Sequence, residues 1–153
     1  MKAILVLNAG SSSLKFALYP INGELAAVPA VSGQVEGIGA TPEITLKAAS
    51  GERIREAVRT SGSQGEQHRD ALNHVFALLN QHHPELDIVA AGHRIVHGGE
   101  RHSAPTRLDE AVLRELDNFV PLAPLHQPHN LRAVRAVAAL MPDVPQVGCF
   151  DTA

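Results

Sequence analysis

The stretch AILVLNAGSSSLKFALYP, residues 3–20, decides the fold of this chain. It opens on a continuous apolar run, residues 3–7, which is typical of a strand buried on both faces. An Asn-Ala-Gly turn signal ends this run, and residues 15–19 supply a second strand that the following proline is expected to end. The stretch therefore predicts an N-terminal hairpin with three consecutive serines, residues 11–13, at its tip.

Beyond the hairpin, the pattern predicts a small antiparallel sheet and then a long helix. Gly and Pro recur through residues 23–59, and strands are expected at 43–47 and 53–58. A polar loop at 61–65 precedes a helix that is expected to end near His83. The apolar residues of this helix have the spacing of one helix face, and they are Leu72, Val75, Phe76 and Leu79.

Two further helices and two further strands complete the expected order. Asp109 can cap the second helix, and Pro128 suits the first turn of the third. Their apolar positions are Val112, Leu113, Leu116 and Val120 in the second helix, and Leu131, Val134, Ala138 and Met141 in the third. The strands are expected at 87–96 and 146–150. This order indicates an α/β fold, a mixed sheet with helices packed on it.

Composition excludes several classes of protein. With 153 residues, the chain suits one domain that buries roughly 70% of the surface its unfolded form exposes. The formal net charge is −3 and aromatic residues make up 3%, so nucleic acid and anionic membrane are disfavoured as partners. The chain has no apolar run of a length typical of a signal peptide or a membrane span. The single cysteine, Cys149, is expected to be a small core residue, and we expect a soluble, cytoplasmic protein.

Four polar groups lie at the ends of expected strands or helices: Asn8 with the serine turn, Arg94, His126 and Asp151. In open α/β sheets, ligands bind beyond the strand ends. Taken alone, each group has a simpler explanation: Asn8 as a turn former, Arg94 as a surface cation, His126 as a helix cap and Asp151 as a loop carboxylate. Together they supply what phosphoryl transfer requires, which is positioning and charge stabilisation at the oxygens of the moving phosphoryl group.

The residue types in these positions suit that reaction. Backbone amides and hydroxyls at residues 10–13 can surround a phosphate, and Gly10 allows a close approach of the backbone. Arg94 offers a planar fork for a carboxylate or a phosphate. Asp151 can hold Mg²⁺ directly or through water. The turn is not a Walker A loop, because AGSSSLK lacks a second glycine immediately before the lysine.

Four segments resemble consecutive motifs of the acetokinase family, the acetate kinases of the sugar kinase/Hsp70/actin superfamily. They are LVLNAGSSSLKF at 5–16, AGHRIVHGGE at 91–100, LAPLHQPHNL at 122–131 and FDTA at 150–153. The resemblance implies a ribonuclease H-like nucleotide-binding domain with a mixed sheet and flanking helices. It also implies a phosphotransferase with a carboxyl group as acceptor. In that reaction ATP and acetate give ADP and acetyl phosphate by direct in-line transfer, with Mg²⁺ or Mn²⁺.

The resemblance further implies roles for individual residues. Asn8 would contact the ATP phosphates and help organise the metal, together with Asp151. The phosphate turn would comprise Gly10, Ser11, Ser13 and Lys15. Arg94 would bind the acetate carboxylate and the transferring phosphoryl group, and His126 would touch that group in the transition state. The pocket for the acetate methyl group would be lined by Val96 and Leu125.

One departure from the family concerns length. Family members are considerably longer and continue their last motif as FDTAFH, whereas this sequence ends at Ala153. The resemblance therefore covers an N-terminal ribonuclease H-like domain, residues 1–153. A second, C-terminal domain would supply the adenosine pocket, further catalytic residues and most of a homodimer interface. We expect this chain to show no significant kinase activity on its own.

Three alternatives stay open at this level. A propionate kinase of the same family is close, because a small apolar pocket separates acetate from propionate by only about 1–3 kcal/mol. A non-catalytic nucleotide-binding module is less favoured, because such a module has no need for the carboxylate grip of Arg94. A metal site of His93 with His97, or of His126 with His129, lacks a cysteine or acidic residue at a recognisable spacing.

Overall fold

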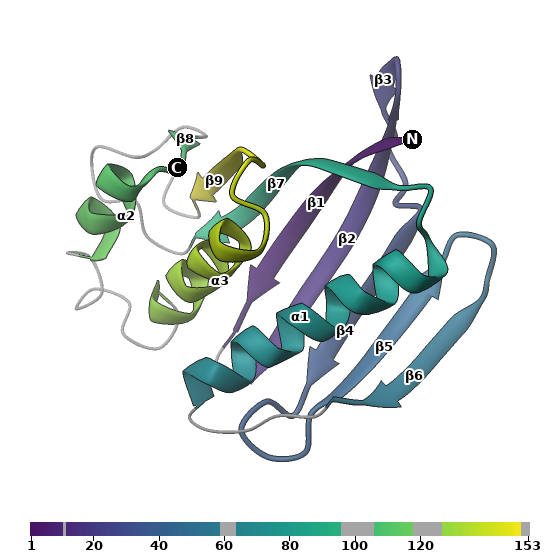
Figure 1. Ribbon diagram of the computed structural model, residues 1–153, viewed down its shortest axis with the longest axis horizontal. Helices are drawn as coiled ribbons and strands as arrows, with labels where there is room; N and C mark the ends of the chain where they lie inside the picture. The colour runs from purple at the N-terminus through teal and green to yellow at the C-terminus, as the bar shows by residue number, and fades with distance from the viewer. Residues whose placement is uncertain (11, 59–63, 96–105, 118–126, 151–153) are drawn as a thin grey trace.

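A mixed sheet forms the centre of the structure (Figure 1). The computed structural model describes residues 1–10, 12–58, 64–95, 106–117 and 127–150. Within these residues the sheet has nine strands, in the order β6-β5-β4-β2-β1-β7-β9-β8, with β3 paired to β2. The strands are β1 (Lys2–Ala9), β2 (Ser13–Asn22), β3 (Glu24–Leu25), β4 (Val31–Glu36), β5 (Glu43–Ala48), β6 (Arg53–Ala57), β7 (Asp87–Ile95), β8 (Thr106–Arg107) and β9 (Gln146–Phe150). The helices are α1 (Gln64–His82), α2 (Glu110–Asp117) and α3 (Gln127–Leu140).

The predicted N-terminal hairpin is present and is longer than expected. β1 and β2 pair antiparallel from Ala3↔Pro20 to Ala9↔Leu14. Pro20 therefore lies inside β2 and does not end it. The pairing of β2 with β4 stops at Leu18↔Val31. Proline has no N–H, and at this position the missing N–H would point toward the β4 side of β2. Because the β2–β4 pairing has already ended at Leu18, the proline costs no hydrogen bond to β4.

Three parallel strands end at the same edge of the sheet. β1 runs parallel to β7, with Leu7 opposite His93, and β7 runs parallel to β9, with Arg94 opposite Cys149. The carboxyl ends of these strands therefore meet where the hairpin turns from β1 into β2. This is the kind of edge at which open α/β sheets bind ligands.

Helices α1 and α3 lie across one face of the sheet (Figure 1). They contact each other, and α3 also contacts β1 and β7 while α1 contacts β2. Alternate residues of β1 are buried beneath them: Ala3, Leu5, Leu7 and Ala9. The residues in between lie on the other face, which we call the open face, and Val6 is 40% exposed there. The prediction that this strand is buried on both faces is therefore wrong, because the described helices cover only one.

Helix α1 confirms the prediction of its apolar face. Leu72, Val75 and Leu79 are buried, and Phe76 is partly buried against the same core. The helix begins at Gln64, so it includes the end of the expected loop. No helix among the described residues combines the length and the apolarity needed to cross a membrane.

Helices α2 and α3 also form where the sequence predicts them. The N–H of Val112 donates to Asp109 Oδ1 at 2.8 Å, which confirms the cap of α2. In α3, Leu131 and Val134 are buried as expected. The periodic pattern predicts Ala138 as the next buried residue, but in the structure Val137 is buried and Ala138 is exposed. Val120, also expected to be apolar core, lies outside the described residues.

Two local predictions on strands are wrong. The sequence pattern did not identify β4, which pairs with β2 and β5. Cys149 was expected in the core, but its side chain is exposed. Side chains alternate along β9, so the buried Gln146 and Gly148 face the helices and Cys149 lies on the open face.

Candidate functional site

The tip of the hairpin is a tight turn. The N–H of Gly10 donates to the carbonyl of Ser13 at 2.9 Å, and the N–H of Ile38 donates to the carbonyl of Ser12 at 3.0 Å. A Cβ added at Gly10 would lie 3.0 Å from Ser13 Oγ, so this hydroxyl would have to move. Glycine at this position therefore avoids a close contact with the Ser13 hydroxyl.

Four of the predicted site residues lie on the open face, on adjacent strands. Asn8 pairs with Lys15 across the hairpin, and Ser13 precedes Lys15 by two residues, so all three side chains share one face. Arg94 lies on the same face, because its neighbour His93 is buried against the helices, as Leu7 is beside Asn8. Asn8 and Ser13 are half-buried, and Lys15 and Arg94 are exposed. The topology thus brings these residues to one end of the sheet from distant parts of the sequence.

Other predicted site residues lie outside the part of the chain that the structure describes. They are Ser11, Val96, Leu125, His126 and Asp151. Three of them adjoin described elements in the sequence: Val96 follows β7, Asp151 follows β9, and His126 precedes α3.

Sequence reasoning missed a carboxylate at this edge. Glu36 is the last residue of β4 and pairs with Ser13 of β2. Its neighbour Val35 is buried against the helices, so Glu36 belongs to the open face. Within the described residues, no three His, Cys, Asp or Glu side chains come together in a way that could hold a metal ion.

Sequence reasoning also missed two side chains that hold the hairpin tip from the helix side. His68 Nε2 of α1 lies 2.9 Å from the Gly10 carbonyl, and Asn130 Nδ2 of α3 donates to the Ala9 carbonyl at 2.8 Å. A carbonyl can only accept, so His68 Nε2 is the donor. Both side chains are buried, at 8% and 3% exposure. A signal for them existed in the sequence, because each is a polar residue four positions before a buried apolar one, Leu72 or Val134.

A second buried polar chain joins β7, β9 and α3. His93 Nε2 donates to Gln146 Oε1 at 2.5 Å, and Gln146 Nε2 donates to the Val134 carbonyl at 3.0 Å. Burial lowers the pKa of His93 to about 4, although the hydrogen bond to Gln146 opposes this shift. His93 is therefore neutral at neutral pH. This ring is buried on the helix side of the sheet, and the metal site with His97 that was left open stays untested, because His97 lies outside the described residues.

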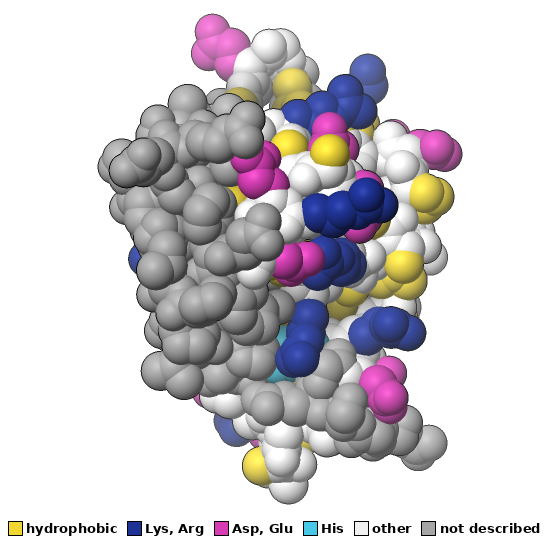
Figure 2. Space-filling view, turned by 90° about the vertical axis from the view of Figure 1, so that its left-hand side faces the viewer, with side chains coloured by type: hydrophobic (Ala, Val, Ile, Leu, Met, Phe, Trp, Pro, Cys, Tyr) yellow, Lys and Arg dark blue, Asp and Glu magenta, His cyan; other side chains and the backbone are white. Residues whose placement is uncertain are grey.

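Arginine side chains lie on the helix side of the hairpin tip. A hollow of about 190 Å³ lies between α1 and α3, and its wall includes Ala9 and Leu14 beside the turn. Arg69, Arg132 and Arg135 also line this hollow. Figure 2, which looks at the molecule from the side of α2 and α3, shows Lys and Arg side chains along this face with Asp and Glu side chains between them. Arg135 is paired with Asp117, and Glu36 shares the open face with Lys15 and Arg94, so cations and carboxylates are mixed around the tip.

The comparisons with known proteins agree with one family. The model of the acetokinase family matches residues 3–153. Acetate kinase from Methylocella silvestris is 40% identical over 157 residues, and acetate kinase from Streptomyces coelicolor is 42% identical over 160 residues. These matches cover 99% and 98% of this chain but 39% and 36% of the relatives. The chain thus spans less than two fifths of the length of these curated relatives.

Solved structures share the fold. Porphyromonas gingivalis acetate kinase superposes with a TM-score of 0.84 at 32% identity, and a propionate kinase from Francisella tularensis with 0.83 at 33%. Both comparisons cover 99% of this chain, and 38% and 37% of the two structures. The predicted ribonuclease H-like fold, with a mixed sheet and flanking helices, is therefore confirmed. The chain belongs to the acetokinase family.

Proposed function

We propose that this chain is the phosphate-binding and carboxylate-binding domain of an acetate kinase. The reaction is the reversible transfer of the γ-phosphoryl group of ATP to acetate, giving ADP and acetyl phosphate. One observation carries the proposal: Asn8, Ser13, Lys15 and Arg94 share the open face at one end of the sheet, in a chain that matches the acetokinase family from residue 3 to residue 153.

The bonding changes are simple and need no general base. Acetate is ionised at neutral pH, so a carboxylate oxygen can attack the γ-phosphorus directly. A new P–O bond to acetate forms, and the P–O bond to ADP breaks. Catalysis then depends on bringing two anions together and stabilising charge on the equatorial oxygens. Arg94 suits this task, because its planar fork can hold the acetate carboxylate and the transferring phosphoryl group.

The hairpin tip would hold the ATP phosphates. The Gly10 N–H is bonded to the Ser13 carbonyl, so the donors would be the backbone amides that follow Gly10 and the hydroxyls of Ser11 and Ser13. Lys15 adds a positive charge on the same face. The side-chain oxygen of Asn8 and the carboxylate of Asp151 are the kind of ligands that Mg²⁺ prefers, and Mn²⁺ accepts them too. Asn8 lies half-buried on the open face beside the phosphate turn, which fits a metal ligand. When bound, the metal would neutralise charge on the phosphate oxygens.

Other residues would complete the acetate site. His126 would touch the phosphoryl group in the transition state, and Val96 and Leu125 would enclose the methyl group. Propionate is a second candidate substrate, since the structural neighbours include a propionate kinase with nearly the same TM-score as an acetate kinase. One added methylene in an apolar pocket changes specificity by only 10–200-fold.

We also propose that a second domain completes the enzyme. It would supply the adenosine pocket and most of a homodimer interface, which accounts for the greater length of the relatives. The scattered surface charge favours small-molecule partners over nucleic acid or membrane, and we propose a cytoplasmic location.

A complementation assay tests this proposal. The chain is mixed with the part of Methylocella silvestris acetate kinase that follows its matched region, and acetyl phosphate is trapped with hydroxylamine. We expect no significant activity from the chain alone and clear acetate-dependent and ATP-dependent activity from the mixture. The same enzyme from Methylocella, divided at the same point, is the positive control. If its two parts restore activity and the mixture with this chain does not, the proposal is wrong.

A further inference from the structure

We propose that His68 and Asn130 are positioning residues that orient the hairpin tip for phosphate binding. This inference rests on the proposed function, because it assigns to these two side chains the support of the phosphate turn. Neither lies on the open face, and both reach the tip from the helices beneath it. They act through the backbone of Ala9 and Gly10 and would not touch the substrates.

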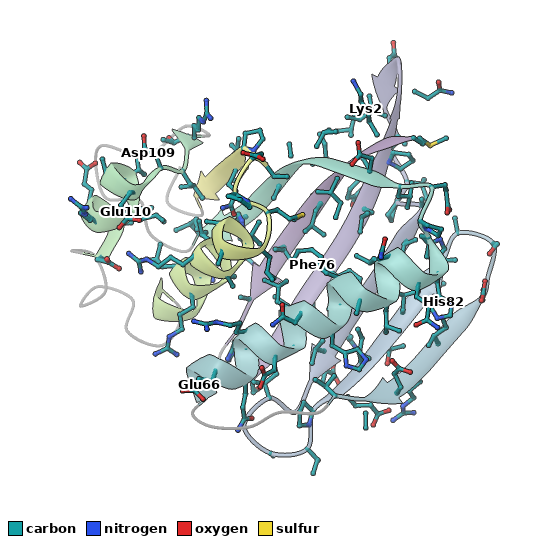
Figure 3. All side chains as sticks on the ribbon, in the orientation of Figure 1. Lys2, Glu66, Phe76, His82, Asp109 and Glu110 are labelled. Carbon is teal, nitrogen blue, oxygen red and sulfur yellow. The ribbon has the colours of Figure 1, made fainter. Side chains whose placement is uncertain are left out.

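His68 ties the tip to α1. It lies in the second turn of the helix, and its ring is 8% exposed. Figure 3 labels Glu66, two residues earlier, at the end of α1 that lies next to the tip. Donation from Nε2 to the Gly10 carbonyl satisfies a backbone acceptor for which the hairpin ladder has no partner, because the ladder ends at Ala9↔Leu14.

Asn130 ties the same turn to α3. Asparagine is a poor residue inside a helix, and a buried amide is costly unless it is hydrogen-bonded. Its side chain is 3% exposed and donates to the Ala9 carbonyl across 121 positions of sequence. The two helices thus hold two consecutive carbonyls of the turn, each with one hydrogen bond.

Fixing these carbonyls fixes the direction of the peptide units. In a trans peptide the C=O and the N–H point in opposite directions, and the described residues contain no cis peptide bond. The peptide unit of the Ala9 carbonyl carries the Gly10 N–H, which donates to the Ser13 carbonyl, so holding the Ala9 carbonyl also holds the hydrogen bond that closes the turn. Without this support, a turn that contains glycine and serines would lose more conformational entropy when it binds an anion. We infer that the two hydrogen bonds preorganise the tip.

The experiment measures binding of Mg²⁺-tripolyphosphate to the full 153-residue chain, with the amide signals of Gly10, Ser12 and Ser13 as reporters in ¹⁵N–¹H NMR spectra. This probe contains the phosphates alone. We compare His68→Leu, which loses the donor, with His68→Gln, whose amide nitrogen reaches about as far as Nε2. His74→Leu is the matched control, because His74 lies on the same helix and contacts Glu56 at 2.6 Å, away from the tip. Asn130→Leu removes the second hydrogen bond, with the exposed Asn80→Leu as its control.

We expect His68→Leu and Asn130→Leu each to weaken binding roughly five- to tenfold, the loss typical of one hydrogen bond. His68→Gln should restore most of the affinity, and the two control variants should bind as the wild type does. If His68→Leu and Asn130→Leu bind no more weakly than their controls, the inference is wrong and the proposed function stands. If the wild-type chain does not shift its tip amides with the probe, the phosphate role of the turn fails and the inference fails with it.

A second measurement needs no variant and so does not depend on how well the variants fold. Long-range ¹H–¹⁵N spectra of the wild-type imidazoles should show His68 as the Nε2–H tautomer, with signals that shift when the probe binds. A His68 ring in the other tautomer, or one that does not respond while the tip amides do, would overturn the inference.

Discussion

Neighbouring residues of β7 serve opposite faces of the sheet. Arg94 is exposed on the open face, whereas His93 is buried at 3% exposure and donates to Gln146. The sequence predicts Arg94 as a site residue from its place at the end of a strand. The motif that contains Arg94, residues 91–100, also contains His93 and His97, and spacing alone does not tell which of the two is structural. The alternation of side chains along a strand explains the outcome, because it turns adjacent residues to opposite sides.

Burial of His93 predicts a dependence of stability on pH. The pKa of His93 is lowered to about 4 from 6.5, so between these values the unfolded chain binds more protons than the folded one. Stability is then fully present above pH 6.5 and falls as the pH drops toward 4. From this group alone we expect a loss of about 2 kcal/mol at pH 5 relative to pH 7.

Urea unfolding at pH 7 and pH 5 measures this effect. His93→Gln should lose about 2 kcal/mol less between the two pH values than the wild type does. His82→Gln, at the exposed end of α1, is the control for replacing a histidine with glutamine. Equal pH dependence of His93→Gln and the wild type would contradict the assignment of the shift to His93.

At the scale of elements, β4 shows why part of the sheet could not be predicted. Its sequence, VSGQVE, contains a glycine among polar residues and so has the pattern of a loop. In the structure, Gly33 lies opposite Phe16 of β2. A Cβ there would lie 2.6 Å from Phe16 Cζ and 2.3 Å from the Thr45 carbonyl oxygen. A contact with a ring from a neighbouring strand is not visible in a local pattern, whereas the helices were predicted because their periodicity is local.

The same contact predicts the effect of a substitution in β4. Gly33→Ala should destabilise the chain by about 1–3 kcal/mol, because the added methyl group overlaps backbone as well as a side chain. Gly92→Ala in β7 is the matched control, since a Cβ at Gly92 meets nothing within 4 Å. We expect it to leave stability unchanged within about 0.5 kcal/mol. Urea unfolding checks both, and equal stabilities of the two variants would contradict the packing argument.

At the scale of the molecule, the candidate site depends on strand order. Asn8 and Arg94 are far apart in sequence and come together because β1 runs parallel to β7. Local patterns predicted each strand but not this pairing, and the resemblance to the acetokinase family supplied the expectation that these residues share a site. The two helix residues at the tip, His68 and Asn130, were missed because their partners are backbone carbonyls in another element.

The central claim is that the open face at this end of the sheet carries the reaction. It is tested most directly by Arg94→Ala in the complementation assay, with Arg53→Ala as the control, because Arg53 is also exposed but lies on β6 at the opposite side of the sheet. We predict that Arg94→Ala lowers kcat/KM roughly 100-fold or more, the loss typical of removing a group that stabilises transition-state charge. Arg53→Ala should stay within about twofold of the wild type. Activity of Arg94→Ala equal to that of Arg53→Ala would contradict the account.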